Sequence, residues 1–472
     1  MQMSEDLIRS VVQQVLTQMG GSNGSTNGAA HSSGGRDGVF PTIDAAVEAA
    51  ESAFQAFRRR PLKDRDRAIQ VVKRICAENA EELGRQELEE TKIGRLDHKI
   101  AKLRDFVPII PGVEYLRTNC DSGDGGLTLT DYSPFGVVGA ITPVTHSLPT
   151  LAGNAVNLLA SGNTAVFNAH PSGAQIAAEG VRRFNRGIAQ EIGLENLLTI
   201  VETPTLESAQ ALFDHRGVKL LVVTGGPAVA RAALGSKKRA IVAGPGNPPV
   251  VVDSTACLDN AARSIVEGAA FDNNLLCIGE KQVFAVSEIF EKLMDAVARH
   301  GGFRLQPAQV ENLTRSAFSQ GDDGKLHLKK DLVGQDPAVL GRHAGVEVPK
   351  GTQILFGETI EDHPFVEHEQ MMPFIPFVRV ANVDRAIELA RSSEHGYGHT
   401  AVLHSRDTSV MQKMGRVMDC TIFVINGPCT AGLGGEGVPS FSIAGPTGEG
   451  VTTPLTFTRQ RRTAVVGSMR FL

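Results

Sequence analysis

The chain has little that would bring it to a membrane or a nucleic acid. Among its 472 residues, no apolar run reaches the roughly 18 residues that span a bilayer. Its 47 basic and 52 acidic residues are mixed along the sequence and leave a net charge of −5, so no basic surface is indicated. The N-terminus also lacks the basic, apolar and small-residue segments of a secretion signal. We therefore expect a soluble intracellular protein that binds neither nucleic acid nor membrane.

The usual signatures of crosslinked or metal-bound cysteine are absent. The six cysteines lie far apart and form no Cys-x-x-Cys pair, so neither a disulfide framework nor a zinc site is indicated, and we expect no metal. They are Cys76, Cys120, Cys257, Cys277, Cys420 and Cys429. Most of these thiols should be buried, and a reactive one would be the exception.

The N-terminal residues 1–19 have the pattern of an amphipathic helix, with Ser4 as N-cap and apolar residues at helical spacing. Residues 20–38 are rich in Gly, Ser, Asn and Thr and predict a flexible linker. The helix could dock on its own chain or on a neighbouring subunit. Alternatively, it could be a targeting segment that binds another protein through its apolar stripe.

The body of the chain, 42% hydrophobic overall, predicts α/β domains. After helical patterns up to about Arg104, short apolar runs alternate with helix-length segments, which is typical of buried parallel strands. These runs are 136–143, 163–169, 197–201 and 219–226, separated by predicted helices at 147–160, 172–191 and 205–214. We expect a Rossmann-type domain over 39–242, with ligands at the carboxyl ends of its strands.

No Gly-x-Gly-x-x-Gly fingerprint marks a dinucleotide site in this domain. Gly225 and Gly226 follow a predicted strand and open a helix, where backbone N–H groups could meet an anion. A Gly-Gly turn is also common without any ligand. The other strand-end segments are TPVTHS (142–147), NAHPS (168–172) and ETPT (202–205).

A second α/β domain is predicted over 243–430, with strands at 282–286, 352–356 and 376–381. Residues 431–450 are expected to return to the first domain. The alternating segments 127–132 and 454–467 predict strands of an oligomerisation flap, which we assign to residues 121–135 and 451–472.

Cys277 lies in the polar stretch FDNNLLCIGEK (271–281), between a predicted helix at 259–270 and the strand at 282–286. In such an irregular segment a thiol can be exposed and its pKa lowered by backbone donors, as a nucleophile requires. The alternative is an ordinary structural cysteine.

Six motifs resemble, in order and spacing, the CoA-acylating aldehyde dehydrogenases of bacterial microcompartments, above all the acetaldehyde and propionaldehyde dehydrogenases of ethanolamine and propanediol utilisation. The similarity covers the whole chain and includes the N-terminal extension. It implies the aldehyde dehydrogenase fold, with an NAD-binding domain, a catalytic domain and a β flap. The motifs are TGGPA (224–228), AGPGNPPVVVD (243–253), FDNNLLC (271–277), EQMMPFIP (369–376), INGPC (425–429) and PTGEG (446–450).

The resemblance implies that Cys277 is the nucleophile, which forms a thiohemiacetal with the aldehyde and then a thioester. The oxyanion would bind the Cys277 backbone N–H and one side chain. The family usually has an Asn for this second donor, and this chain has His146. His146 could donate in its place, or it could be a packed or solvent-bonded histidine.

The resemblance also assigns the NAD site. Glu369 matches the carboxylate that accepts hydrogen bonds from the nicotinamide ribose, and Thr224, Gly225 and Gly226 match the turn at the pyrophosphate. Thr142 and Pro143, at the end of a predicted strand, are also expected to contact the cofactor. His170-Pro171 is a further candidate for the nucleotide end of NAD or CoA, unless it is simply a strand-ending turn.

Hydrolytic relatives carry a general-base Glu where this chain has Ala243, so a thiol is the natural acceptor of the acyl group. The implied reaction is aldehyde, NAD⁺ and CoA to acyl-CoA and NADH. The alternatives are a hydrolytic or phosphorylating dehydrogenase, or an adaptor with a decayed catalytic centre. The aldehyde (acetaldehyde, propionaldehyde or lactaldehyde) and the preference for NAD over NADP stay open.

The expected partners are CoA, a small aldehyde, and a microcompartment shell or core protein that would bind the N-terminal helix. We expect a homodimer or homotetramer in the bacterial cytoplasm, inside a microcompartment.

Overall fold

The computed structural model describes residues 37–321, 324, 326–434, 437–467 and 469. The predicted helix at 1–19, and all but the last two residues of the predicted linker, lie outside these ranges. The chain forms two compact units. Unit 1 contains the described residues up to Val72, together with Gly112–Val242 and the chain from Phe457. Unit 2 contains Lys73–Pro111 and Ala243–Thr456.

Unit 1 is built on a six-stranded sheet in the order β1-β6-β5-β4-β7-β8, whose central pairs are all parallel. The predicted βαβαβαβ pattern is confirmed, with strand boundaries within two residues of those expected. The strands are β1 (Val39–Phe40), β4 (Val137–Thr142), β5 (Thr164–Ala169), β6 (Leu198–Val201), β7 (Val218–Thr224) and β8 (Ala240–Ala243).

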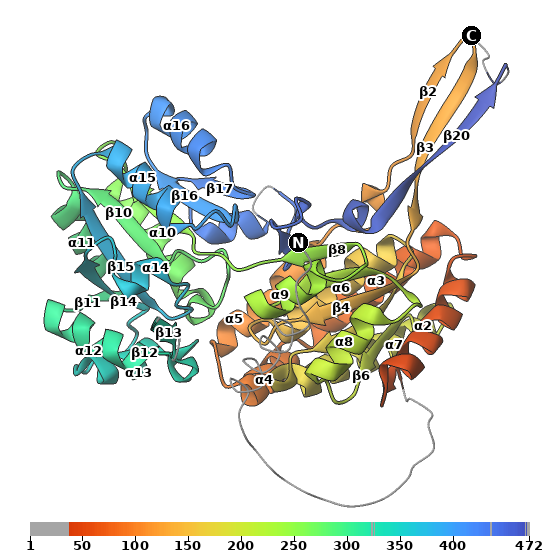
Figure 1. Cartoon of the computed structure of the whole chain (residues 1–472), viewed down its shortest axis with the longest axis horizontal. Coiled ribbons are helices and arrows are strands. Elements are labelled where there is room, and N and C mark those ends of the chain that lie inside the picture. Colours follow the sequence, from red (N-terminus) through yellow and green to blue (C-terminus); the bar gives the residue numbers. More distant parts are fainter. Residues whose placement is uncertain (1–36, 322–323, 325, 435–436, 468, 470–472) are drawn as a thin grey trace, which may run out of the picture. The chain divides into compact units, whose positions relative to one another are not determined.

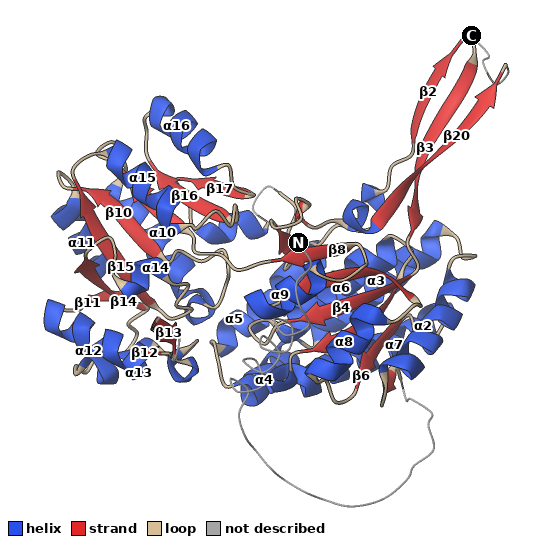
Figure 2. Ribbon diagram, in the orientation of Figure 1, coloured by secondary structure: helices blue, strands red, loops and turns tan. Residues whose placement is uncertain are grey.

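Helices flank this sheet (Figure 2). The side chains of α2, α8 and α9 share one apolar cluster with the strands, whereas α6 packs against α7. Local signals set the helix ends: Thr42 caps α2, and Thr205 and Ser208 form a capping box on α8. The helices are α2 (Ile43–Phe57), α6 (Ser147–Ala160), α7 (Ala174–Ile192), α8 (Leu206–Asp214) and α9 (Pro227–Leu234). A further helix, α3 (Leu62–Glu78), begins in unit 1 and continues into unit 2 from Lys73.

Three further strands of unit 1 form an antiparallel arm that extends away from the sheet (Figure 1). They are β2 (Asn119–Gly123), β3 (Gly126–Pro134) and β20 (Thr458–Val466). The register pairs Thr458 with Pro134 and Val466 with Gly126. Both segments expected to form flap strands do so, although residues 454–457 form a short helix before β20, and the two strands pair with each other. Most of β20 is exposed, which leaves the arm without a core of its own.

Unit 2 contains a seven-stranded parallel sheet in the order β11-β14-β15-β10-β9-β16-β17. All three strands predicted here are present. The strands are β9 (Pro249–Val252), β10 (Gln282–Val286), β11 (Gly302–Arg304), β14 (Ile354–Thr359), β15 (Phe374–Val380), β16 (Thr400–His404) and β17 (Ile422–Ile425). Two small hairpins add β12 (Phe318–Gln320), β13 (Leu326–Leu328), β18 (Ile443–Ala444) and β19 (Gly450–Val451).

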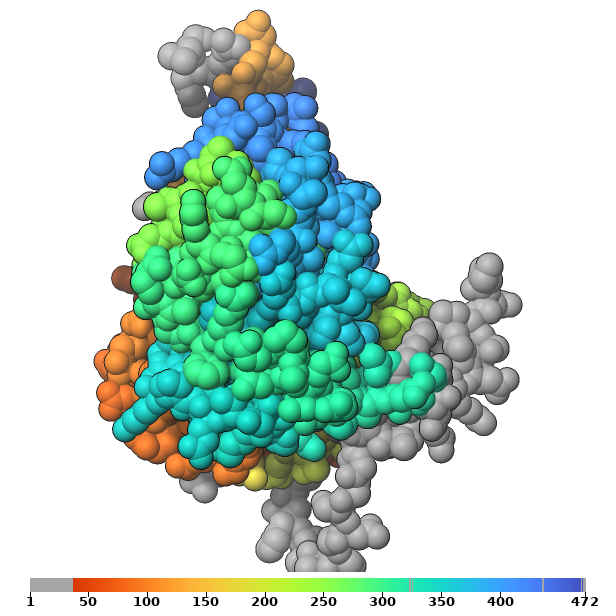
Figure 3. Space-filling view, turned by 90° about the vertical axis from the view of Figure 1, so that its left-hand side faces the viewer, coloured from red at the N-terminus to blue at the C-terminus, as the bar shows by residue number. Residues whose placement is uncertain are grey.

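The helices of unit 2 include α11 to α15, whose stretch of chain, green to blue, forms much of the face shown in the space-filling view (Figure 3). They are α4 (Ala80–Thr91), α5 (Leu96–Ala101), α10 (Leu258–Ala270), α11 (Phe290–Arg299), α12 (Pro307–Ala317), α13 (Pro337–Ala344), α14 (Pro364–Glu367), α15 (Val383–Ser393) and α16 (Thr408–Met418). None of the helices in the described ranges is long and apolar enough to cross a membrane.

Two segments pack differently from the expected domain boundaries. Residues 73–111 belong to unit 2, where Lys102 forms a buried ion pair with Asp272. Residues 431–450 also belong to unit 2, instead of returning to the first domain. Leu433 and Ile443 explain this placement, because both are buried in the main apolar core of unit 2.

Candidate active site

The backbone before Cys277 has an uncommon conformation. Asp272, Asn273 and Asn274 lie consecutively in the left-handed region, with φ of 50°, 55° and 64°. Asp and Asn tolerate this region better than other L-residues, because their short polar side chains can hydrogen-bond locally. All three side chains are buried, so each needs polar partners. The FDNN sequence thus specifies a sharp turn between α10 and Cys277.

Asp272 is held by the segment that the sequence had assigned to the other domain. Its carboxylate pairs with Lys102 and accepts a hydrogen bond from the Arg95 backbone N–H at 2.8 Å. Lys99 lies 3.9 Å away. Burial alone would raise the pKa of the Asp272 carboxyl, but the two lysines lower this pKa to about 2. The carboxylate is therefore charged at neutral pH and fully paired.

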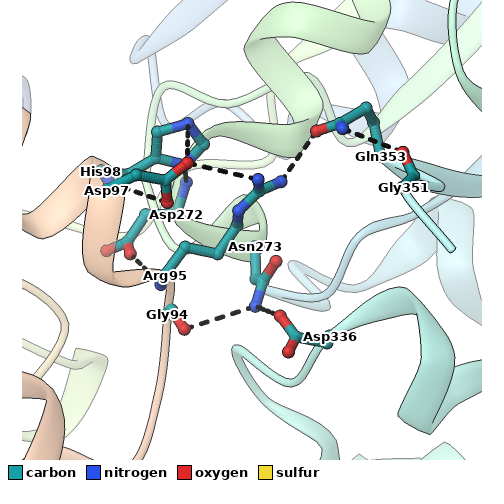
Figure 4. Close-up of polar contacts among 9 residues, drawn as sticks. All are labelled: Gly94, Arg95, Asp97, His98, Asp272, Asn273, Asp336, Gly351 and Gln353. Atoms are coloured by element: carbon teal, nitrogen blue, oxygen red, sulfur yellow. Dashed lines mark hydrogen bonds and ion pairs between the residues drawn. The ribbon is translucent and has the colours of Figure 1, made fainter.

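Asn273 ties the same turn to a second segment (Figure 4). Its Nδ2 donates to the Gly334 carbonyl at 3.0 Å and to Asp336 Oδ1 at 2.8 Å. Arg95, beside it, donates from Nη1 to Gln353 Oε1 at 2.8 Å. The turn before Cys277 is thus attached to two separate parts of unit 2, residues 94–102 and 334–336, which limits how far it can move.

Cys277 itself is half-buried, between the buried side chains of Leu276 and Ile278. It lies between α10 and β10, as predicted. Burial first, and the nearby Glu369 carboxylate second, raise the pKa of its thiol to about 12, whereas Lys281 and the backbone N–H groups of Cys277 and Ile278 act to lower it. The resting thiol is therefore protonated, but it already lies among donors that would stabilise a negative charge.

Glu369 is the carboxylate that faces this thiol. Burial raises its pKa to about 7, opposed by Lys281 and by the Gly246 backbone N–H, which donates to it. At neutral pH it therefore exchanges between the protonated and ionised forms. The next residue, Gln370, is fully buried and donates from Nε2 to the carbonyls of Lys281 and Phe374, both at 3.0 Å.

Sequence reasoning missed Gly246 and His399. A Cβ on Gly246 would lie 2.6 Å from the Cys277 carbonyl oxygen and 3.0 Å from His399 Cγ, so these three residues meet in close contact. His399 is buried, its Nδ1 lies 2.8 Å from the Thr400 hydroxyl, and its Nε2 has no hydrogen-bond partner. Burial, and then the charge of Lys281, lowers the pKa of His399 to about 4.

These properties make His399 a neutral imidazole with one free nitrogen beside the Cys277 segment. When Nδ1 carries the proton toward Thr400, Nε2 is a proton acceptor. The signal that could have revealed His399 in the sequence is faint. It is a histidine directly before the strand of β16, with no fixed spacing to Cys277.

The other thiols are poorer candidates for a nucleophile. Cys429 is fully buried, and its backbone N–H donates to Glu280 Oε1 at 2.7 Å. Burial and then Glu280 raise the pKa of the Cys429 thiol well above its usual range. Cys76 is also buried, whereas Cys120 and Cys257 are exposed. No group of three or more His, Cys, Asp or Glu side chains in the described ranges could hold a metal ion.

The remaining predicted site residues lie at the carboxyl ends of adjacent strands of unit 1. Thr142 ends β4; its side-chain oxygen is buried without a hydrogen-bond partner, and Pro143 follows it. His146 is buried at the N-cap position of α6, where its carbonyl accepts the Thr150 N–H at 3.0 Å. These positions match the expected ligand side of a Rossmann-type sheet.

His170 and Pro171 form the turn after β5. The His170 backbone N–H donates to the Thr142 carbonyl at 3.0 Å, and its ring Nδ1 accepts the Ser172 N–H at 3.1 Å. The ring therefore caps its own turn, which agrees with the strand-ending interpretation. A nucleotide contact through Nε2 stays a prediction.

Thr224 ends β7, and Gly225 and Gly226 lead into α9. The position of a Cβ on Gly226 meets no atom within 4 Å, so the approach to the start of this eight-residue helix is open. Together with the unpartnered Thr142 hydroxyl, these features fit a dinucleotide, whose pyrophosphate would bind at the helix start and whose hydroxyl or amide groups would pair with Thr142.

Comparisons with known proteins agree with this geometry. The chain is 43% identical over 439 residues to the acetaldehyde dehydrogenase (acetylating) EutE of Salmonella typhimurium, covering 92% of this chain and 94% of that protein. A crystal structure of Rhodopseudomonas palustris propionaldehyde dehydrogenase, with bound CoA and an acylated cysteine, superposes with a TM-score of 0.88 at 42% identity, covering 91% and 98% of the two chains.

A third relative is a propionaldehyde dehydrogenase from the fucose utilisation bacterial microcompartment of Clostridium phytofermentans. Its TM-score is 0.89 at 38% identity, with 92% of this chain and 100% of that chain covered. The model of the aldehyde dehydrogenase family matches residues 37–305. This chain therefore belongs to the aldehyde dehydrogenase family.

Proposed function

We propose that the chain is a CoA-acylating aldehyde dehydrogenase that converts a small aldehyde, NAD⁺ and CoA into acyl-CoA and NADH, with Cys277 as the acyl carrier. The observation that carries this proposal is the half-buried Cys277, which follows a turn held by residues 94–102 and 334–336 and lies beside backbone N–H groups that act to lower the pKa of its thiol. A relative of the same fold has been seen with an acylated cysteine and bound CoA, which supports the same use of Cys277.

In the first half-reaction, the Cys277 thiol transfers its proton to the unpartnered Nε2 of His399, and the thiolate attacks the aldehyde carbon to form a thiohemiacetal. The negative charge that develops on oxygen is stabilised by the Cys277 backbone N–H, and His146 is the predicted second donor. Loss of a hydride from the former aldehyde carbon then leaves a thioester on Cys277.

Bound NAD⁺ would supply the acceptor for this hydride. Of the chain's own residues, we assign Gly225 and Gly226 to its pyrophosphate, Thr142 and Pro143 to the same strand-end site, and Glu369 to the nicotinamide ribose. Glu369 can perform this task in its ionised form, because a carboxylate only accepts hydrogen bonds and the ribose offers two hydroxyl donors.

In the second half-reaction, the CoA sulfur attacks the thioester carbon and the Cys277 thiolate leaves. His399 is suited to take the proton of the incoming thiol, because its Nε2 is unpartnered and its imidazole is neutral. Water is a weaker competitor, since Ala243 is buried at the end of β8 and has no carboxylate with which to activate it.

The deciding experiment separates the two half-reactions. The purified chain is mixed with propionaldehyde and NAD⁺ without CoA, then digested and examined by mass spectrometry. We expect a propionyl adduct on the Cys277 peptide and a burst of NADH, followed by steady turnover to propionyl-CoA when CoA is added. Release of propionate at the same rate with or without CoA would instead indicate a hydrolytic enzyme.

The finer assignments are supported by separate features. The exposed arm of β2, β3 and β20 is suited to pairing with another copy, which supports a homodimer or homotetramer. The similarity to microcompartment enzymes supports a location inside such a compartment. Residues 1–19 would be the segment that binds a shell or core protein. A panel of acetaldehyde, propionaldehyde and lactaldehyde with NAD⁺ and NADP⁺ would identify the preferred substrates.

A further inference from the structure

Lys281 is a fully buried lysine four residues after Cys277 and directly before β10. Nothing in the reaction described above uses it. Burial of an ammonium group is costly unless its protons are hydrogen-bonded and a negative charge lies nearby. The contacts of Lys281 therefore indicate why it is there.

All three of its contacts are with the segment before Cys277. Its Nζ donates to the Asn274 carbonyl at 2.8 Å, to Asn274 Oδ1 at 2.5 Å and to the Leu276 carbonyl at 3.1 Å. An ammonium group has three N–H donors, whereas a neutral amine has two, so this set of three acceptors matches the charged form. Burial lowers the pKa of Lys281, but the Glu369 carboxylate acts in the opposite direction.

The contact with the Leu276 carbonyl acts directly on Cys277. Leu276 C=O and Cys277 N–H belong to one planar trans peptide and point in opposite directions from it. A group that holds this carbonyl therefore also sets the direction of the Cys277 N–H. The Gly279 backbone N–H binds the same carbonyl at 3.0 Å, so the peptide is held by two donors.

Lys281 also acts through its charge. Among the groups that affect the Cys277 thiol, it is the cation that lowers the pKa, opposing Glu369. The other titratable groups that face Lys281 are Cys429 and Glu280, and it also acts on His399. The backbone of Lys281 is also held in place, because Gln370 Nε2 donates a hydrogen bond to its carbonyl at 3.0 Å.

We propose that Lys281 is a positioning residue of the reaction, whose ammonium orients the Leu276–Cys277 peptide so that the Cys277 N–H points at the oxyanion, and whose charge favours the Cys277 thiolate. This inference rests on the proposed role of Cys277 as nucleophile. It predicts that loss of the ammonium impairs bond formation at Cys277 in both half-reactions.

The test compares Lys281→Met with the wild-type enzyme at the level of single steps. We expect kcat to fall by ~10²-fold or more, as on loss of an oxyanion donor. The KM for NAD⁺ should rise only as far as the pKa of Glu369 does, because the same ammonium lowers that pKa. The rate at which iodoacetamide alkylates the Cys277 peptide, followed by mass spectrometry, should fall by about tenfold at pH 8, equivalent to a rise of one pKa unit. Lys281→Arg, which keeps the charge, should recover most of the alkylation rate.

Lys102→Met is the matched control. It also removes a buried ammonium that contacts the segment before Cys277, through Asp272, but this ammonium does not act on the pKa of Cys277. Its melting temperature should fall, whereas the pH profile of Cys277 alkylation should stay unchanged. If Lys281→Met does not fold, the pH profile of Cys277 alkylation is measured on Lys281→Gln instead. This variant keeps two donors without the charge, and the same fall in the alkylation rate is expected.

The outcomes also separate this inference from the proposed function. A Cys277→Ala enzyme that still forms NADH would overturn the proposed nucleophile. If Cys277→Ala is inactive but Lys281→Met keeps wild-type kcat and alkylation, or if Lys102→Met shifts the alkylation profile equally, only the role of Lys281 is overturned.

Discussion

Gln370 Nε2 donates a hydrogen bond to the Lys281 backbone carbonyl at 3.0 Å. This contact joins the residue after Glu369 to the residue whose ammonium holds the peptide of Cys277. Both side chains are fully buried, so no water competes for the bond. The carboxylate assigned to the nucleotide and the turn that carries the nucleophile are therefore parts of one hydrogen-bonded unit.

Substitution of two cysteines in the same core separates the nucleophile from a structural thiol. Cys277→Ala should abolish NADH formation, including any single-turnover burst, because no acyl-enzyme can form. Cys429→Ala should leave turnover largely intact, since Cys429 is buried against Glu280 and its thiol is held in the protonated form.

The measurement is a stopped-flow trace of NADH absorbance, together with labelling of each cysteine peptide. Because Cys120 and Cys257 are exposed, a bulky thiol reagent is expected to label them without loss of activity. Loss of activity in Cys429→Ala, with activity retained in Cys277→Ala, would reverse the assignment.

His146→Ala should lower kcat by ~10²-fold or more with little change in cofactor affinity, because an oxyanion donor is removed. His146→Asn should be tolerated, since the family usually has an amide donor at this position. Steady-state kinetics of both variants provide the check. An Ala variant with wild-type kcat would leave His146 as a buried structural residue at the start of α6, where its side chain makes no capping hydrogen bond.

Deletion of residues 1–20 should leave kcat and KM nearly unchanged and release the enzyme from microcompartment shells in cells. These residues lie outside the described part of the chain, so the prediction rests on their apolar helical pattern. Val11→Glu with Val15→Glu should have the same effect, because charges would enter the apolar contact. Fluorescence microscopy and shell co-purification measure the outcome; a truncated enzyme that still co-purifies with shells would exclude the targeting role.

Four strands of the first sheet and three of the second could be predicted from sequence, because each is a short apolar run between turn residues. The run 136–143, for example, contains β4 at Val137–Thr142. The place of residues 73–111 could not be predicted, because it depends on the ion pair of Lys102 with Asp272, 170 positions along the chain. Propensity and periodicity describe local structure only.

Within the site, the sequence revealed the thiol but not its surroundings. Cys277 stands out as a thiol in an irregular polar stretch, whereas Lys281 resembles any charged residue at the start of a strand. Lysine is almost never fully buried unless it is paired, so burial of Lys281 would not be assumed from sequence. The pair Glu280-Lys281, directly before an apolar strand, is the signal that could have drawn attention to it.

Gly246→Ala should impair catalysis through a steric effect. The added Cβ would lie 2.6 Å from the Cys277 carbonyl oxygen, which belongs to the backbone and cannot move cheaply. We expect a loss of stability of about 1–3 kcal/mol, as for an overpacked core, and a lower kcat because the Cys277 peptide is displaced. Thermal unfolding and kcat are measured together.

Gly437→Ala is the control for the glycine substitution, since no atom lies within 4 Å of its Cβ position. It should change neither quantity. A Gly246→Ala enzyme with normal stability and kcat would show that the backbone around Cys277 can move apart without affecting the reaction.

The affinity for NAD⁺ should rise with pH across the titration of Glu369. Burial raises the pKa of this carboxyl to about 7, so it is mostly protonated at pH 6 and mostly ionised at pH 8. Only the ionised form is purely an acceptor for the ribose hydroxyls, so binding should tighten roughly tenfold between these two pH values. His399 does not titrate in this range, because its pKa is about 4.

Stability should change in the opposite direction. Because burial raises the pKa of Glu369 in the folded state, its carboxyl keeps its proton to a higher pH than in the unfolded chain. The free energy of unfolding therefore falls as pH rises from about 4.5 to about 7. Glu280, whose pKa burial also raises to about 7, contributes to the same fall in stability but has no place in the ribose contact.

Glu369→Gln should therefore remove the pH dependence of NAD⁺ binding, measured by quenching of NADH fluorescence or by calorimetry, while part of the pH dependence of stability remains. A Gln variant whose NAD⁺ affinity still rises tenfold from pH 6 to pH 8 would mean that another group titrates in the nucleotide site.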